Sequence, residues 1–244
     1  MKAALRIGAA AAGATLALGM TGSTFAVSGA SSTPSASSSS AAASSSGRLD
    51  AVKALANARI QGRLATLHAL SLAVSDSKFL TSSEQSTLNN QINSDLSGLT
   101  ALATKVSNET TAAAVRSDEV AMVDDYRVYL LMAPQARLTE ALAAESDAAA
   151  TLQKAYIALQ EMLAKQSGGG TSTQKSELAD LQSQITAAQA AIGNNVATEL
   201  AIQPGPDESA ITAALSPDRS ATKTAHDDLK QARDDAKDLR SSLS

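Results

Sequence analysis

The segment LTEALAAESDAAATLQKAYIALQEMLAKQSGGG, residues 138–170, carries the most regular pattern in the chain. From Leu138 to Leu163 the residues of one helical face recur with alternating gaps of four and three. This 3.5-residue period predicts a helix that packs in a left-handed coiled coil. Glu145 occupies one position of this face, where a polar side chain can set the register or the partner.

A glycine run, Gly168, Gly169 and Gly170, ends this pattern, and a second one of the same period follows over residues 178–192. A short glycine-rich connection between two matched helices indicates an antiparallel pair. We therefore expect an antiparallel coiled-coil hairpin over residues 134–203, with the three glycines at its tip as a candidate interaction site.

Helical periodicity also extends through the chain on both sides of the hairpin. The predicted helices cover residues 49–74, about 81–106, about 110–133 and 217–244. Thr81 or Ser82 can act as the N-cap of the second one, because Glu84 or Gln85 completes a capping box. Since these four helices have similar lengths, we predict an all-α, up-down bundle of residues 48–133 and 217–244 from which the hairpin protrudes.

Two prolines mark the junctions of this architecture. Pro134 follows apolar residues with no N-cap among them, which indicates a kink in one long helix rather than a loop. Residues 204–216 are expected to be a linker with a short helical piece around 209–215. Ser216-Pro217-Asp218 is expected to open the last helix, because Pro and Asp suit a first turn.

The first thirty residues have the pattern of a secretory signal peptide. Lys2 and Arg6 precede an apolar run, and small residues suit cleavage after Ala26 or Ala30. The run is shorter than the ~20 residues of a membrane-spanning helix, so we expect cleavage and no stable transmembrane span. Residues 31–47, rich in Ser and Ala, are expected to be a flexible linker, with glycosylation as an alternative.

Composition excludes several functional classes. The chain has 244 residues, no Cys, no Trp and 2% aromatic residues. There is therefore no thiol nucleophile, no disulfide and no cysteine-based metal site. The formal net charge is −4, and loss of Lys2 and Arg6 would make it −6, so we expect no nucleic-acid binding.

One cluster of polar and aromatic side chains is distinctive. Tyr126, Arg127 and Tyr129 stand together, and at helical spacing the two tyrosines share a face. Two rings and a guanidinium can form a stacking or anion-binding platform, but large side chains near a kink are more often structural. His68 and His226 are the two histidines, and neither stands in a nucleophile or metal-site pattern.

The acidic residues of the last helix alternate with basic ones, which is typical of a solvated face. We expect neither a metal site nor a cofactor, and we name no catalytic residue.

The export signal, the Ser/Ala-rich spacer, the Tyr126-Arg127-Val128-Tyr129 segment before Pro134 and the Ala232-Arg233-Asp234-Asp235-Ala236 segment resemble those of uncharacterised exported helical proteins of high-GC bacteria. The resemblance implies no activity and transfers no functional residue.

The sequence favours a non-enzymatic, exported or envelope-associated interaction protein that acts through coiled-coil surfaces. The expected partner is a protein or a cell-wall polymer, and the chain is expected to be a monomer or a coiled-coil dimer. One alternative is a ligand-binding or sensor bundle that uses Tyr126, Arg127 and Tyr129. A second alternative is a membrane-active protein whose amphipathic helices open onto a bilayer.

Overall fold

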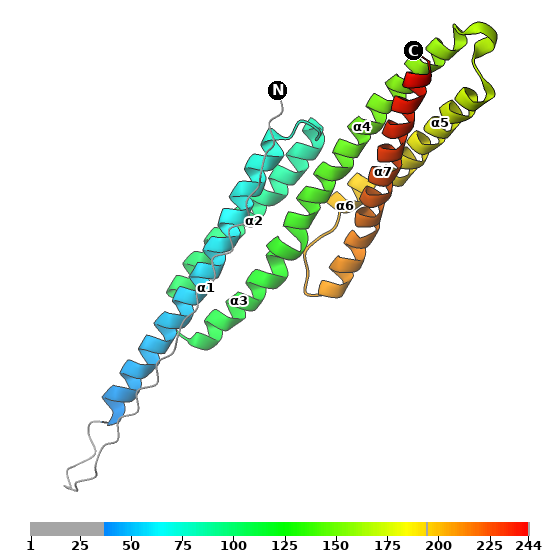
Figure 1. Ribbon diagram of the computed structural model, residues 1–244. Coiled ribbons are helices and arrows are strands. Elements are labelled where there is room, and N and C mark those ends of the chain that lie inside the picture. The colour runs from blue at the N-terminus through cyan, green and yellow to red at the C-terminus, as the bar shows by residue number, and fades with distance from the viewer. Residues whose placement is uncertain (1–36, 194, 244) are drawn as a thin grey trace, which may run out of the picture.

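A computed structural model describes residues 37–193 and 195–243, and every regular element in this part of the chain is helical (Figure 1). The predicted all-α class is therefore confirmed. The expected signal peptide, residues 1–30, lies outside the described residues. In the described residues, no helix combines the length and the apolar character that crossing a membrane requires.

The molecule is built on a spine of consecutive helical segments. Helix α3 (Ala112–Tyr126) leads into a π-helical turn (Val128–Met132) and then into α4 (Ala133–Ala164), and together they extend along the molecule (Figure 1). The α-helical conformation is interrupted at Arg127, which has a left-handed backbone with φ 41° and ψ 38°. The sequence predicted a kink without a loop at Pro134, and the residues on both sides of Pro134 are helical, whereas the left-handed break lies earlier, at Arg127. Pro134 lies in the first turn of α4. The π turn before it changes the backbone hydrogen bonding at the point where the proline ring would obstruct a regular α-helix.

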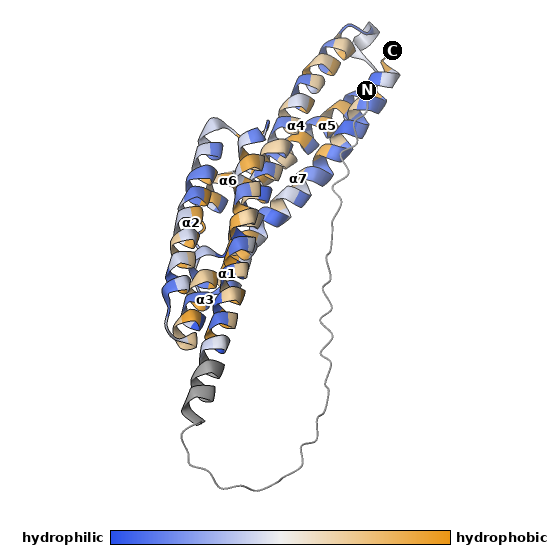
Figure 2. Cartoon of the chain, turned by 90° about the vertical axis from the view of Figure 1, so that its left-hand side faces the viewer, coloured by the Kyte–Doolittle hydropathy of each residue, from blue (hydrophilic) through white to orange (hydrophobic). Residues whose placement is uncertain are grey.

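On one side of the spine lies the pair formed by α1 (Ser37–Asp76) and α2 (Ser82–Asn108). The apolar stripes of these helices meet α3 and the start of α4 in one core, which includes Ile60, Leu67, Leu88, Ile92 and Leu99. Figure 2 shows the hydrophobic residues interleaved along these helices. The capping box predicted for α2 is present, since Thr81 Oγ1 accepts from Glu84 N and Glu84 Oε2 accepts from Thr81 N.

On the other side, α5 (Ser172–Ile192), the short α6 (Asn195–Leu200) and α7 (Glu208–Ser242) complete the fold. The regular stripes of α4, α5 and α7 form a second core. This core corrects the predicted topology, because the C-terminal helix packs mainly on α4 and α5 and meets residues 48–133 at Arg127 and the π turn. Small Ala225, Ala232 and Ala236 stand among the leucines of the α7 stripe and let the helix lie close in the groove between α4 and α5.

Two expected linkers are partly helical. Helix α1 begins at Ser37, inside the segment 31–47 that is expected to be flexible, and an extension of a helix that already exists avoids the cost of nucleation. Helix α7 begins at Glu208, inside the segment 204–216, and contains Pro217. Ile211 and Leu215 are buried against Leu131 of the π turn, and this packing holds the turn before Pro217 in helical form.

Candidate functional site

The three residues predicted as a platform do not form one. Tyr126 ends α3, and its ring lies directly on Gly98 of α2, where an added methyl group would overlap it. Tyr129 lies beyond the left-handed break and contacts α1 instead, with the Arg63 guanidinium 5.2 Å from its ring centroid. The break at Arg127 therefore sends the two rings to different helices, although their spacing predicted a shared face.

Arg127 acts as a clamp between the spine and the start of α7. Its Nε donates to Gly205 O at 2.8 Å, and one terminal nitrogen pairs with Glu208 Oε1 at 2.9 Å. The other terminal nitrogen donates to Asp124 Oδ1 at 2.9 Å and to Pro206 O at 2.7 Å. Because the side chain is buried and engaged by carboxylates and carbonyls, it is not available to receive an anion.

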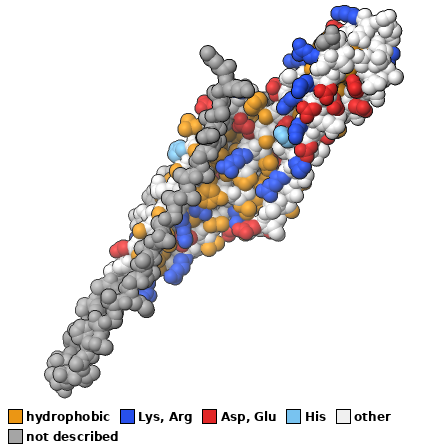
Figure 3. Space-filling model, in the orientation of Figure 1, with side chains coloured by type: hydrophobic (Ala, Val, Ile, Leu, Met, Phe, Trp, Pro, Cys, Tyr) orange, Lys and Arg blue, Asp and Glu red, His pale blue; other side chains and the backbone are white. Residues whose placement is uncertain are grey.

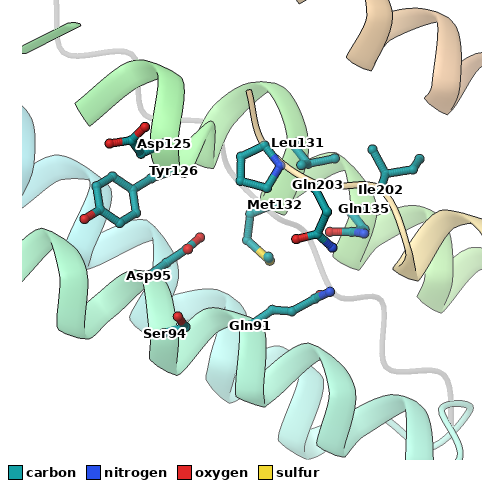
Figure 4. A pocket seen from close by; sticks show the side chains of 11 residues that line it. Gln91, Ser94, Asp95, Asp125, Tyr126, Leu131, Met132, Gln135, Ile202 and Gln203 are labelled. Carbon is teal, nitrogen blue, oxygen red and sulfur yellow. The ribbon is translucent and has the colours of Figure 1, made fainter. Parts of the chain in front are cut away.

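A hollow of about 250 Å³ lies beside this clamp, between α2, the spine and the loop that precedes α7. Figure 4 shows Gln91 and Asp95 on α2 pointing towards the side of the hollow formed by Tyr126, Met132 and Gln203. Sequence reasoning named only Tyr126 of these residues. The others come from α2, the π turn and the loop before α7, and only tertiary packing brings these segments together.

The hollow is rich in hydrogen-bond acceptors. Gln91 Nε2 donates to Leu200 O and Gln135 Nε2 to Glu199 O, whereas the side-chain oxygens of both glutamines are buried and accept no hydrogen bond within the described residues. Burial raises the pKa of the Asp95 carboxyl to about 6. Burial, assisted by the charges of nearby aspartates, also raises the pKa of the Tyr126 phenol. The lining therefore suits a ligand that donates hydrogen bonds and carries positive charge.

Behind the hollow, two carboxyl groups are buried where α4, α6 and α7 meet. Glu199 and Asp218 are almost fully inaccessible, and Thr139 Oγ1 donates to Glu199 Oε2 at 3.4 Å. Burial first, and the nearby Asp218 second, raise the pKa of Glu199 to about 8. Burial also raises the pKa of Asp218. Glu199 is therefore mostly protonated at neutral pH, which lowers the cost of burying it.

The predicted tip lies at the far end of the spine. Gly168, Gly169 and Gly170 all have positive φ, and Gly170 also packs against the Leu163 side chain so closely that it leaves no space for a Cβ. A Cβ added at Gly168 would meet nothing within 4 Å. The geometry explains why glycines stand here, as a tight connection between α4 and α5.

The two histidines and the acidic run lie on the surface. His226 Nδ1 lies 2.9 Å from Glu145 Oε1, so the polar residue in the α4 stripe contacts α7 rather than α5. Figure 3 shows acidic and basic side chains interspersed on the arm that contains α7, where Lys223 pairs with Asp227 at 2.5 Å. Among the described residues no group of three or more metal-ligating side chains occurs.

Sequence reasoning missed a second regular pattern on α1, on the side opposite its core stripe. The positions recur with gaps of four and three, and all seven are exposed: Ala51, Leu55, Ala58, Gly62, Ala65, Ala69 and Leu72. We call this set the α1 face. Its leucines are 51% and 68% exposed. The signal was present in the sequence, but the larger residues of the core stripe on the same helix obscured it.

The fold thus defines an all-α protein in which α1 and α2 pack on the first part of the spine and α5 and α7 pack on α4. Comparison of the chain with protein-family models, with curated proteins and with solved structures gave no match.

Proposed function

We propose that this chain is a non-enzymatic interaction protein, exported to the envelope or the medium, that binds its partner through an exposed helical face by coiled-coil packing. The observation that carries the proposal is the α1 face. A helix that is apolar on both sides is typical of a buried element, yet one side of α1 is exposed along this stretch. An exposed, continuous apolar stripe is characteristic of a surface that receives a partner.

The regular spacing of the α1 face favours a helical partner over a polymer. Gaps of four and three keep a stripe in line with a second helix over several turns. Alanines and glycine let the two backbones approach closely, and the two leucines provide side chains that fill spaces on the other helix.

Site-specific photo-crosslinking in the producing cells tests this function. A photoreactive residue in place of Leu55 or Ala65 is expected to give a defined adduct, whereas one in place of the exposed Ala158 on α4 gives none. Fractionation with N-terminal sequencing is expected to recover a chain outside the cytoplasm that starts near residue 27 or 31. Absence of an adduct from both α1 positions contradicts an interaction through this face.

A second candidate function is supported by the hollow, which we propose as a site for a small organic cation. The carboxylates of Asp95 and Asp125, which line the hollow, are the groups that would receive its N–H donors. With 1,4-diaminobutane as the probe, the melting temperature is expected to rise in the wild type. The rise is expected to be smaller below pH 6, where Asp95 is protonated, and to vanish in Tyr126→Ala. An equal rise in Tyr126→Ala refutes this site.

A further inference from the structure

The α1 face has a sequence that is complementary to itself. In an antiparallel arrangement, residues whose numbers add up to 123 or 124 lie opposite one another. Every large residue then meets a small one, and the glycine meets its own copy. The pairs are Ala51 with Leu72, Leu55 with Ala69, Ala58 with Ala65, and Gly62 with Gly62.

The charges at the two ends of the face follow the same rule. Continuing the spacing by one step in each direction reaches Arg48 and Asp76, which are both exposed. An antiparallel pair of α1 helices places Arg48 of each chain opposite Asp76 of the other, so one ion pair forms at each end of the helix pair. A parallel pair would instead place like charges together and would align leucine with leucine, which leaves the small positions unfilled.

The surrounding structure leaves most of this face open. The buried side of α1 packs on α2, α3 and the start of α4, and the α1 face points away from them except at Gly62, beside which the Tyr129 hydroxyl of the π turn lies. The arm formed by α5 and α7 lies on the other side of the spine (Figure 1). From Arg48 to Asp76 the face is about 42 Å long at 1.5 Å per residue, which is enough for a continuous helix pair.

We infer that the partner of the α1 face is a second copy of this chain, docked antiparallel about a two-fold axis that passes near Gly62. The inference rests on the proposed function and names the partner of the same surface. A two-fold interface requires a patch that complements itself, and the α1 face meets this requirement in both size and charge.

The chain contains no cysteine, so introduced cysteines report the arrangement directly. The full chain is prepared as Ala58→Cys and as Ala65→Cys, and each is oxidised alone and in an equal mixture. An antiparallel pair is expected to give a mixed disulfide dimer and little dimer from either variant alone, because each residue lies about two helical turns from its own copy. Ala158→Cys, an exposed alanine on α4, mixed with Ala65→Cys serves as the matched control.

Light scattering on the cysteine-free chain provides the second measurement. The wild type is expected to have the mass of two chains, and Ala65→Glu is expected to weaken the dimer at least tenfold while the far-ultraviolet circular dichroism stays unchanged. Asp76→Arg is expected to weaken it less, and Arg48→Asp combined with Asp76→Arg to restore it. These substitutions lie on the exposed side of α1, so they do not disturb the core.

Three outcomes overturn the inference: a monomeric wild type, a dimer that Ala65→Glu leaves intact, or disulfides that form in each single variant alone. The proposed function is separable from it. If the purified chain is monomeric but the photoreactive residue at Leu55 captures a different protein in cells, the interaction function stands and the second copy is excluded as partner. If neither measurement detects a partner, both proposals fail.

Discussion

Replacement of Glu199 by glutamine should make the folded state more stable at and above neutral pH. The side chain is fully buried, and its carboxyl keeps its proton to a pKa of about 8, compared with 4.5 for a free glutamate. Between these two values the folded state holds a proton that the unfolded state has lost. The free energy of unfolding therefore falls as the pH rises through this interval. Glutamine has nearly the same shape and no titrating proton, so Glu199→Gln removes this fall in the free energy of unfolding.

The size of the effect follows from the two pKa values. One pKa unit corresponds to 1.36 kcal/mol, so the full difference sets an upper limit of about 4 kcal/mol at pH 8 and about 1 kcal/mol at pH 5. Relaxation around the ionised carboxylate reduces these figures. We therefore expect Glu199→Gln to gain about 1–3 kcal/mol relative to the wild type between pH 5 and pH 8.

Urea unfolding at a series of pH values, followed by circular dichroism, measures this difference. Glu161→Gln on the exposed surface of α4 is the matched control and should change neither the stability nor its pH dependence. The free energy of unfolding of the wild type should fall more steeply with pH than that of Glu199→Gln. The two curves of free energy against pH should approach each other near pH 5. Parallel curves from pH 5 to pH 8 would show that Glu199 is ionised in the fold and would refute the reasoning.

Three further substitutions test the local structure. Gly170→Ala should cost about 2 kcal/mol more in urea unfolding than Gly168→Ala, since both glycines have positive φ but only Gly170 is pressed against a leucine side chain. Arg127→Met should cost about 2 kcal/mol and speed proteolysis of residues 203–207, because the clamp on this loop is lost; cleavage at the wild-type rate would contradict the clamp. Lys105→Met should lower the free energy of unfolding because it leaves the buried Asp118 without its ion pair, and adding Asp118→Asn should recover part of this loss.

The stripes of the helices were predictable because each is a local property of the chain. Leu142, Leu152 and Leu163 on α4 and Leu181 and Ile185 on α5 are all buried, as the alternation of four- and three-residue gaps indicates. Capping was predictable for the same reason, since Thr81 and Glu84 are three residues apart.

The position of the break and the geometry of the hollow were not predictable in this way. Pro134 is the stronger local signal for a break, but the left-handed residue is Arg127, whose conformation is held by Gly205, Pro206 and Glu208 from a distant segment. Asp95, Gln91 and Gln135 enter the site only because α2 packs on the spine.

The sequence by itself determined the helical class, the apolar stripe along each helix and the presence of a second apolar stripe on α1. These properties depend on the 3.6-residue period and on interactions between residues close in the chain. Only the tertiary structure decided that α7 packs on α4 and α5, that Tyr126 and Tyr129 separate, and that the α1 face remains exposed. Helices of similar length and pattern fit several grooves almost equally well, and the choice among them depends on contacts between residues far apart in the sequence.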